Sequence, residues 1–507
     1  MKLNLKGAKI MPASLSAIDI GILLIYCCVV VAMGLYYERR SRTAEQFMVA
    51  GRTIPAWAAG LAVMSTYTSS ISYIATPGKA FDTNWHPIIF SLCIFPVAWF
   101  VCKYAVPYYR KMKSISVYSF LEEKLGRWGR VYAALSFLLY MVGRVAVILY
   151  LVGLLFSTFV PWNICIVILG IGLVTIIYTL LGGMEAVIWT DVMQSAIMIV
   201  GIVFCAVILS MQIFAGPNYL IRSALDADKF SLGSWRLSLS SRTIWVMIIY
   251  GLTENLRNLM ADQNFVQKYG SVPTERQAKR SIWIAMLIYI PLTAIFLYIG
   301  TALFAFYSPA GHKLGAGITR GDEVFPYFIA TQLPAGLKGL VIGAIVAAAM
   351  STIDSALNCS ATVSLLDFHK LYINPKIGDR ASVTFLRLAT VAWGLLGTGF
   401  AILMIRAKSA LDVWWQISGI FGGGILGLFI LSLLKVRLRL WQGLVAIGAS
   451  IAVISWATFA RDLPASWKWA QCDIEGIIIG ALGTAALMVV AIFFGLTNRW
   501  RRCVANN

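Results

Sequence analysis

Long uninterrupted apolar stretches restrict the possible folds of this sequence more than any other feature. Roughly 20 apolar residues in α-helical conformation cross the hydrocarbon core of a bilayer. Backbone groups in lipid must hydrogen-bond within their own segment, so such stretches are predicted to be helices. We predict about thirteen spans from stretches of this length, at residues 15–36, 54–80, 87–107, 131–159, 162–182, 188–214, 243–262, 281–307, 338–365, 383–406, 410–434, 438–461 and 474–496.

The composition agrees with an all-α polytopic membrane protein. Hydrophobic residues make up 59% of the 507 residues and charged residues 13%, and a water-soluble fold at that ratio would expose too much apolar surface. No soluble domain stands out, so residues 1–507 are predicted to form a single membrane domain. The longest interruptions, 216–242 and 308–337, are expected on the outer side.

The formal net charge of +20 comes from basic residues in short loops between the predicted spans. An excess of Lys and Arg marks the cytoplasmic side of a membrane protein. The pattern predicts an outside N-terminus and a cytoplasmic C-terminus in a bacterial inner (cytoplasmic) membrane. The basic face is expected to contact anionic lipid and not nucleic acid. Its residues follow the first, third and seventh spans at 39–52, 110–130 and Lys268, Arg276, Lys279 and Arg280, and others lie at 435–439 and 499–502.

Cysteine and histidine usage argues against metal or enzymatic chemistry. The nine cysteines are scattered, and no pair has the spacing of metal ligands. The three histidines, His86, His312 and His369, are far apart in the chain. No catalytic constellation is apparent, so the protein is not predicted to be an enzyme.

Three stretches inside the predicted spans are too polar for passive anchors. They are Met64–Ser72, Gly251–Asn258 and Met350–Ser355. Transporters built from inverted repeats bind ions at the membrane midplane, where a broken helix frees oxygen atoms. A second span broken at its Ser/Thr run and facing hydroxyls of the ninth span would form an oxygen cage for a monovalent cation. The alternative is that these hydroxyls bond to their own helix or join helices together.

Charged residues inside spans are expensive and point to function. Arg144 lies among apolar residues in the fourth span and would grip a carboxylate, unless it forms a fixed ion pair, for example with Glu254. Asp191 opens the sixth predicted span, where the helix dipole favours it. Asp354 lies well inside the ninth span as a cation ligand or a proton acceptor. Glu254 and Arg257, spaced i and i+3, can pair with each other.

A series of motifs in order resembles the sodium:solute symporter family, and within it the bacterial sialic acid transporters. The resemblance runs from about Thr43 to Ile425. Its pieces are Gly51-Arg52, Pro55 with Trp57-Ala58-Ala59-Gly60, Ser69-Ser70-Ile71, Gly143-Arg144-Val145-Ala146, Gly182-Gly183-Met184-Glu185, Trp189-Thr190-Asp191, Asp262-Gln263, Val266-Gln267-Lys268-Tyr269, Ala347-Ala348-Ala349-Met350-Ser351, Ser418-Gly419 and Gly422-Gly423.

That resemblance implies a LeuT-type core of two inverted five-helix repeats. The core would occupy residues 54–434, with one extra N-terminal helix at 15–36 and two C-terminal helices at 438–496. It also implies a sodium-coupled symporter that works by alternating access, with sodium as its ion and a small organic solute as its partner. A monomer is expected.

The same resemblance implies positions for sodium ions. The first site takes the backbone carbonyls of Ser65, Thr68 and Ala348 and the hydroxyls of Ser351 and Thr352. A second site, found in the sialic acid branch, corresponds to Asp191, Ser351, Asp354 and Ser355. Asp354 stands where that branch has a serine. Either two carboxylates bind the ion more tightly, or one carries a proton.

The implied substrate pocket includes Ser69, Ser72 and Arg144, which match the sialic acid pattern. Tyr67, Pro87 and Ser91 replace its threonine, phenylalanine and glutamine, and Asn255 is a further substrate-binding candidate. Arg144 favours an acidic substrate, such as sialic acid, another acidic sugar or an organic acid. The alternatives are a symporter of neutral solutes such as sugars, or a sodium-linked solute sensor.

Overall fold

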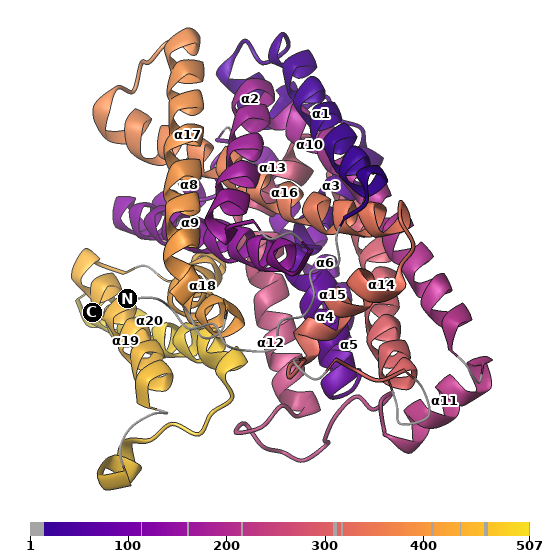
Figure 1. Cartoon of the computed structure of the whole chain (residues 1–507). Helices are drawn as coiled ribbons and strands as arrows, with labels where there is room; N and C mark the ends of the chain where they lie inside the picture. The colour runs from indigo at the N-terminus through magenta and orange to yellow at the C-terminus, as the bar shows by residue number, and fades with distance from the viewer. Residues whose placement is uncertain are drawn as a thin grey trace.

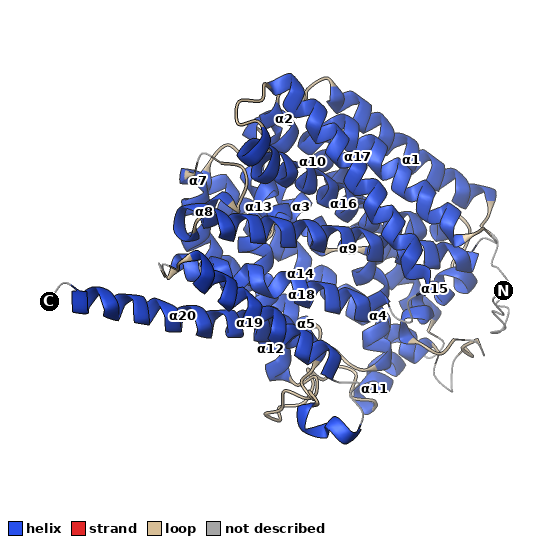
Figure 2. Ribbon diagram, turned by 90° about the vertical axis from the view of Figure 1, so that its left-hand side faces the viewer, coloured by secondary structure: helices blue, strands red, loops and turns tan. Residues whose placement is uncertain are grey.

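The computed structural model describes residues 15–112, 114–159, 162–213, 216–307, 312–315, 318–406, 410–434, 436, 438–460 and 465–505, and in this part the chain is almost entirely helical (Figures 1 and 2). The elements are α1 (Ala17–Glu38), α2 (Ala44–Val49), η1 (Ala50–Arg52), α3 (Ala56–Tyr67), α4 (Ser70–Asp82), α5 (Ile88–Leu92), α6 (Ile94–Phe100), η2 (Val101–Ala105), α7 (Val106–Lys111), α8 (Ser119–Leu125), α9 (Arg127–Phe159), α10 (Ile164–Gln212), α11 (Gly216–Asp226), α12 (Ile244–Leu256), η3 (Arg257–Ala261), α13 (Gln263–Gly270), α14 (Glu275–Phe306), α15 (Gly321–Gln332), α16 (Leu337–Val363), η4 (Ser364–Ile373), α17 (Asp379–Leu403), η5 (Met404–Arg406), α18 (Ala410–Leu433), α19 (Leu440–Phe459), η7 (Ala465–Ala470), η8 (Gly476–Ile478) and α20 (Ile479–Ala505).

Within the described residues, nine helices are long and apolar enough to cross a membrane, or ten if α2–η1 and α3, bent by 110°, form one span. The chain is therefore a multi-pass membrane protein. The number is below the predicted thirteen because several predicted spans are interrupted. The stretch 54–80 is split into α3 and α4, and 243–262 into α12 and η3. In the stretch 410–434 only Ile417–Leu433 is counted, as a shorter apolar helix.

The 49-residue helix α10 contains two of the predicted spans. At 1.5 Å per residue it would be about 73 Å long, more than twice the roughly 30 Å of a hydrocarbon core. Its backbone breaks at Gly183, where φ is 59° and ψ is −156°. Phe47 of α2 packs so closely against Gly183 that a Cβ there would lie 3.0 Å from it. The break separates the predicted spans 162–182 and 188–214.

The break between α3 and α4 lies inside the predicted Ser/Thr run. Thr68 and Ser69 have extended backbones, with ψ of 98° and 176°. Ser69 caps α4, since its hydroxyl accepts a hydrogen bond from the N–H of Ile71 at 3.2 Å, and the Ser72 hydroxyl accepts one from the N–H of Ser69 at 3.4 Å. Short hydroxyl side chains favour such caps over continuous helix. The Ser/Thr run that predicted a broken helix therefore also caps α4, the helix after the break.

A second break follows α12. The chain passes through the wide turn η3 to Asp262, which has an extended backbone with ψ of 118° and whose side chain accepts a hydrogen bond from the N–H of Asn264 at 2.9 Å. Helix α13 then begins and packs against α3. Two broken helices thus meet inside the bundle, and each leaves backbone groups without partners in its own helix.

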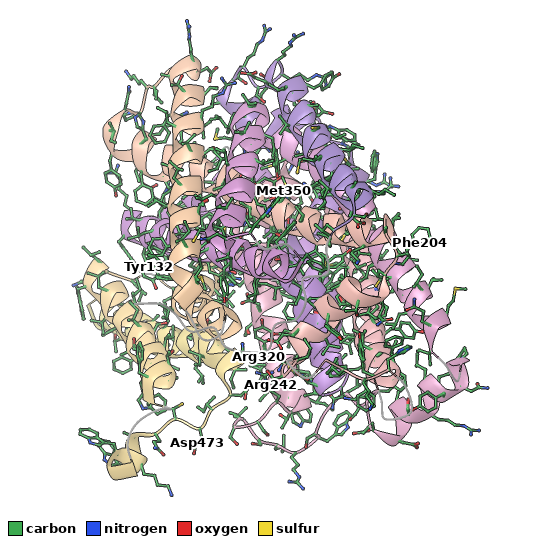
Figure 3. All side chains as sticks on the ribbon, viewed as in Figure 1. Tyr132, Phe204, Arg242, Arg320, Met350 and Asp473 are labelled. Atoms are coloured by element: carbon green, nitrogen blue, oxygen red, sulfur yellow. The ribbon has the colours of Figure 1, made fainter. Side chains whose placement is uncertain are left out.

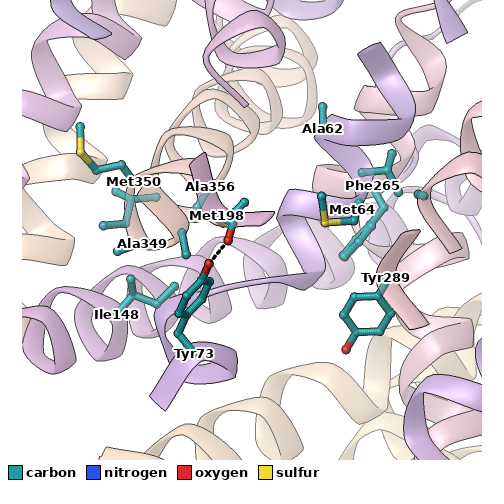
Figure 4. Packing of buried hydrophobic residues seen from close by; sticks show 14 of the residues in the cluster. Ala62, Met64, Tyr73, Ile148, Met198, Phe265, Tyr289, Ala349, Met350 and Ala356 are labelled. Carbon is teal, nitrogen blue, oxygen red and sulfur yellow. Dashed lines mark hydrogen bonds between the residues drawn. The ribbon is translucent and has the colours of Figure 1, made fainter. Parts of the chain in front are cut away.

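Helix α16 runs through the centre of the molecule and α1 lies at its edge. In their most apolar stretches, 94% of residues of α16 are buried but only 22% of α1. Figure 4 shows Ala349 and Ala356 of α16 among the buried side chains, with Tyr73 of α4 hydrogen-bonded to the carbonyl of Met198 in α10. Small residues on α16 allow neighbouring helices to approach closely.

Asp19 of α1 joins this peripheral helix to the start of α16. Its Oδ1 accepts hydrogen bonds from the N–H groups of Gly336 at 2.8 Å and Gly339 at 2.7 Å. A Cβ at Gly339 would lie 2.6 Å from the Cα of Asp19, so only glycine allows this contact. Asp19 therefore satisfies two N–H groups at the first turn of α16, which have no partner within that helix.

The basic loops predicted for the cytoplasmic side meet at one end of the bundle. Arg110 donates hydrogen bonds to the carbonyls of Gly270 at 3.3 Å and Val272 at 3.0 Å, and the N–H of Ile54 bonds to the carbonyl of Ser271 at 3.1 Å. Segments after the first, third and seventh predicted spans are therefore neighbours. Residues 435 and 437 and the side chains of 499–505 lie outside the described part.

The loops predicted for the outer side meet at the other end (Figure 3), where Arg242, Arg320 and Asp473 lie. Arg242 pairs with Glu475 at 2.9 Å. The first N–H of α15 donates to Asp82 at 3.2 Å. The grouping of both sets of loops agrees with the predicted alternation of sides.

Candidate functional site

The residues proposed for a first sodium ion lie on α3 and α16, which pack together. Ser65, Thr68, Ala348, Ser351 and Thr352 all have 0% exposure. The hydroxyls of Ser351 and Thr352 both donate to the carbonyl of Ala348, each at 3.1 Å. Because each hydroxyl has one hydrogen, its oxygen keeps lone pairs for a cation. This all-oxygen donor set fits a hard cation such as Na⁺.

The residues proposed for a second ion surround α10 and α16. Asp191, Asp354 and Ser355 are fully buried. Asp191 lies eight residues beyond the break at Gly183, well inside the second half of α10, so its placement at a helix start was wrong. The helix dipole of that start therefore does not account for its position.

Lys268 was counted with the basic loop residues, and this too was wrong. Its side chain has 0% exposure, and its Nζ lies 2.7 Å from Asp191 Oδ2. The same ammonium donates to the carbonyl of Ala62 at 3.0 Å and to the hydroxyl of Thr66 at 2.6 Å. The Ser65 hydroxyl donates to the same Ala62 carbonyl at 2.9 Å, and Asp191 Oδ1 is buried without a hydrogen-bond partner among the described residues. A fixed cation of the chain thus already binds the carboxylate of the proposed second sodium site.

Asp354 lies beside this pair with partners of another kind. Tyr178 donates to its Oδ2 at 2.7 Å, and the hydroxyls of Ser355 and Thr190 lie at 3.1 and 3.5 Å. Both hydroxyls also have backbone acceptors at shorter distances, the carbonyls of Ser351 and Ala186. Among the described residues, no basic side chain lies within 4.0 Å of Asp354.

The Arg144 side chain extends from α9 toward the break between α3 and α4. Its Nη2 donates to the carbonyl of Thr66 at 2.9 Å, and its Nη1 lies 4.0 Å from Asp262 Oδ2. The hypothesis of an ion pair with Glu254 was wrong, because Glu254 binds Arg257. Since a guanidinium has five N–H groups, Arg144 keeps donors for a ligand at the break.

Arg257 is occupied by its own neighbours. It pairs with Glu254 through two hydrogen bonds of 3.0 and 2.5 Å, which confirms the predicted i, i+3 pair. It also donates to Tyr140 and to Asn258, each at 2.9 Å. A cleft between α12, α18 and α20 is lined by Arg257 and Glu254. Between Arg144 and Arg257, the two buried arginines of the described residues, Arg144 therefore has more N–H donors without a partner.

The other candidates for the substrate pocket lie around the same break. The Tyr67 ring packs against Phe265 and Tyr289, with centroids 4.6 and 5.0 Å apart, and its hydroxyl is buried without a hydrogen-bond partner in the described part of the chain. Ser91 bonds to Thr293 at 3.2 Å. Buried polar atoms without partners are rare, so the Tyr67 hydroxyl is a candidate to bind a polar ligand.

Asn255 and the two cap serines are more constrained. The amide of Asn255 donates to the carbonyls of Phe90 at 2.9 Å and Gly251 at 2.7 Å, while its Oδ1 is buried without a partner. The hydroxyls of Ser69 and Ser72 hold the start of α4. Their proposed contact with substrate would therefore use lone pairs or hydrogens that remain after capping.

The sodium:solute symporter family model matches residues 47–453. The chain belongs to the sodium:solute symporter family. It is therefore a sodium-coupled solute symporter of the multi-pass membrane class and not an enzyme, and sodium is its cotransported ion and not a resident cofactor.

Similar symporters include two bacterial proteins named for sialic acid. The Proteus mirabilis sodium/sialic acid symporter SiaT is 31% identical over 480 residues, which cover 94% of this chain and 96% of the relative. The sodium/sialic acid symporter NanT of Aliivibrio fischeri is 31% identical over 476 residues, which cover 92% of this chain and 91% of the relative. The human sodium-coupled monocarboxylate transporter 1 is 25% identical and covers 88% and 74%.

Solved structures agree with the family fold. A substrate-bound, outward-open Na⁺-coupled sialic acid symporter has a TM-score of 0.88 at 29% identity, covering 95% of this chain and 98% of that one. The nucleobase-cation symporter Mhp1 in a closed conformation has a TM-score of 0.55 at 13% identity, covering 90% and 96%. The second likeness concerns the fold alone.

The sequence analysis missed the roles of Lys268, Asp262 and Tyr178. Asp262 appeared only as part of a motif, and Lys268 appeared in a motif and among the basic loop residues. A signal was present for both, because each belongs to a motif of the family resemblance, Asp262-Gln263 or Val266-Gln267-Lys268-Tyr269. Tyr178 left no signal, since a tyrosine in an apolar span is ordinary.

Proposed function

We propose that this symporter carries an acidic organic solute, sialic acid or another acidic sugar or organic acid, by alternating access. The proposal rests on Arg144. This buried guanidinium lies at the break between α3 and α4 and keeps N–H donors that neither Thr66 nor Asp262 uses. Arginine binds carboxylates through two parallel hydrogen bonds, which suits an acid.

The surroundings of the break support a ligand with both apolar and polar faces. Tyr67, Phe265 and Tyr289 offer aromatic surface, and the Tyr67 hydroxyl and the Asn255 carbonyl oxygen are buried polar atoms without partners. Ser69, Ser72 and Ser91 would add hydroxyls. Two relatives that share 31% identity over more than nine tenths of this chain are named for sialic acid.

Sodium would bind between α3 and α16, at Ser65, Thr68, Ala348, Ser351 and Thr352. Binding there would fix the inner half of the broken helix against the central helix and order the solute site beside it. One Na⁺ moving through 100 mV releases about 2.3 kcal/mol. A tenfold sodium gradient adds about 1.4 kcal/mol. The sum would concentrate a neutral solute about 500-fold.

The further assignments follow from this role. We place residues 54–434 in a core of two inverted repeats, with 15–36 and 438–496 outside it. The protein would act as a monomer in the bacterial cytoplasmic membrane, with an outer N-terminus and with anionic lipid at its basic inner end. A symporter of neutral solutes is the alternative.

The test uses purified protein in liposomes and labelled N-acetylneuraminate, with and without an inward sodium gradient. We expect accumulation only with the gradient, and its loss in Ser351→Ala. Ser360→Ala is a matched control, because Ser360 is a buried serine on the same helix outside the proposed site. Uptake that needs no sodium, or that survives Ser351→Ala unchanged, would contradict the proposed coupling.

The same assay distinguishes acids from neutral solutes. Accumulation of a neutral sugar in place of N-acetylneuraminate and other organic acids would keep the symporter and reject the acidic substrate. Solute binding without any uptake would favour a sensor.

A further inference from the structure

The ammonium of Lys268 is positioned like a bound metal ion. It joins three helices, because its oxygen partners are Ala62 and Thr66 of α3 and Asp191 of α10, while Lys268 belongs to α13. The three distances lie between 2.6 and 3.0 Å. An ammonium has three hydrogens, so these partners use its full donor capacity.

From this geometry we propose that Lys268 takes the place of a second cotransported sodium ion at Asp191, so that the protein binds and moves one sodium ion per cycle. The proposal rests on the sodium-coupled function and on the first sodium site. It goes beyond them by assigning the stoichiometry and the residue that sets it.

The residues implied for a second ion fit poorly around a sodium ion. Of the two carboxylates, Asp191 already has the cation of Lys268 at 2.7 Å. A sodium ion on the other oxygen of Asp191 would lie within a few ångströms of the ammonium. Like charges at such a distance repel strongly in a buried site, where little water screens them. Sodium would have to displace Lys268 or accept this repulsion.

The charge balance of the buried group points the same way. Asp191 and Asp354 contribute two negative charges when ionised, and Lys268 contributes one positive charge. One sodium ion at the neighbouring first site brings the total to zero. A second would leave a net positive charge in a fully buried environment, which is costly. If Asp354 carries a proton, a second sodium would add still more unbalanced charge.

The partners of Asp354 agree with a single sodium ion at the first site. Its contacts are the hydroxyls of Tyr178, Ser355 and Thr190, and no basic side chain of the described residues pairs with it. Tyr26 lies close by and accepts a hydrogen bond from Gln194 at 2.9 Å. Asp354 thus lies near the first site with hydroxyl partners and does not complete a second cation cage.

The stoichiometry has a consequence for transport. With one sodium ion, cotransport of a monoanion moves no net charge, and a tenfold sodium gradient concentrates it about tenfold. A second sodium ion would add another factor of ten and about 50-fold from 100 mV of membrane potential. The two cases therefore differ about 500-fold in the limit of accumulation.

The deciding experiment counts sodium ions on the purified protein by equilibrium dialysis with ²²Na⁺. We expect one ion per wild-type protein, and two in Lys268→Met, because the Asp191 carboxylate becomes available. Lys279→Met is the matched control, since Lys279 is a half-exposed lysine at the same end of the bundle and pairs with Glu275. It should bind one ion.

Two results would overturn the proposal. Wild-type protein that binds two ions would show that Lys268 does not replace one. Folded Lys268→Met that still binds one ion would reduce Lys268 to a structural ion pair. The wild-type count decides even if Lys268→Met fails to fold. In that event the ratio of sodium ions to solute taken up by the wild-type protein gives the second measurement.

A dual-label uptake assay provides an independent readout. The ratio of ²²Na⁺ to N-acetylneuraminate entering liposomes should be one, and a ratio of two would refute the inference. Absence of any sodium-dependent uptake would instead reject the proposed function. The binding count on the purified protein still tests the stoichiometry in that case, so the two failures can be told apart.

Discussion

The sharpest prediction concerns Arg144, whose guanidinium we expect to bind the carboxylate of the solute. One of its five N–H groups is used by the carbonyl of Thr66 at 2.9 Å, and Asp262, at 4.0 Å, is too far for a hydrogen bond. A bidentate contact with a carboxylate is therefore available. In Arg144→Lys the charge remains, but the planar pair of donors is lost.

The cost follows from the number of bonds removed. Loss of one charge-assisted hydrogen bond costs about 1.5–3 kcal/mol, which corresponds to roughly 10- to 150-fold weaker binding. Arg144→Gln removes both bonds and the charge, at about 2–5 kcal/mol, or about 30- to 5,000-fold. The dissociation constant for N-acetylneuraminate, measured by calorimetry at saturating sodium, should rise in that order.

Two controls separate binding of the carboxylate from collapse of the site. Affinity for ²²Na⁺ should stay within a few-fold of wild type in both variants, because Arg144 is not among the proposed sodium ligands. A neutral amino sugar without a carboxylate should lose little affinity. Equal dissociation constants for N-acetylneuraminate in wild type and Arg144→Gln, with sodium binding intact, would refute the reasoning.

Three further predictions concern stability, measured as the apparent melting temperature in detergent. Gly300→Ala would place a Cβ 2.1 Å from the carbonyl of Pro77 and should cost about 1–3 kcal/mol or more, whereas Gly170→Ala meets nothing within 4 Å and should be tolerated; equal melting points would contradict the close packing of α14 on α4. Asp367→Asn removes one partner of the buried ion pair with Arg130, whose Nε–Oδ1 distance is 2.6 Å, and should lower the free energy of unfolding by about 3 kcal/mol. An unchanged melting temperature would show that the pair does not stabilise the fold. Burial, with nearby cations, lowers the pKa of His86 to about 4. The neutral imidazole therefore stabilises the fold above pH 6.5, and this contribution, about 3 kcal/mol at most, is lost as the pH falls toward 4. His86→Gln should flatten the melting temperature between pH 4 and 6.5, and an equally steep pH dependence would exclude His86 as its cause.

The sequence predicted the parts of the fold that depend on local chemistry. The Ser/Thr run around Ser69 predicted a broken helix because hydroxyl side chains cap helices, and the break lies within that run. The pair of Glu254 and Arg257 followed from helical spacing alone. Apolar length predicted where the spans lie. Fewer described helices pass the length criterion as they stand, because breaks shorten some of the predicted spans and α10 contains two of them.

Tertiary features were less accessible from the sequence. Lys268 follows a polar stretch and precedes other basic residues, so the pattern places it in a loop, and only the packing of α13 against α3 and α10 buries it. Asp191 was misplaced because the start of its helix depends on the positive φ of Gly183. The sodium and solute roles of individual residues remain proposals that rest on the family resemblance and on this geometry.

The contact between Asp19 and the first turn of α16 gives α1 a mechanical meaning. A transporter that rocks needs a stationary frame as well as a moving part. Because two N–H groups of α16 are held by Asp19, any slide of the central helix along its axis must drag α1 through the lipid or break both bonds. The peripheral helix then holds α16 at a fixed position along its axis. Loss of the Asp19 carboxylate would let α16 shift and would loosen the ion site farther along the same helix.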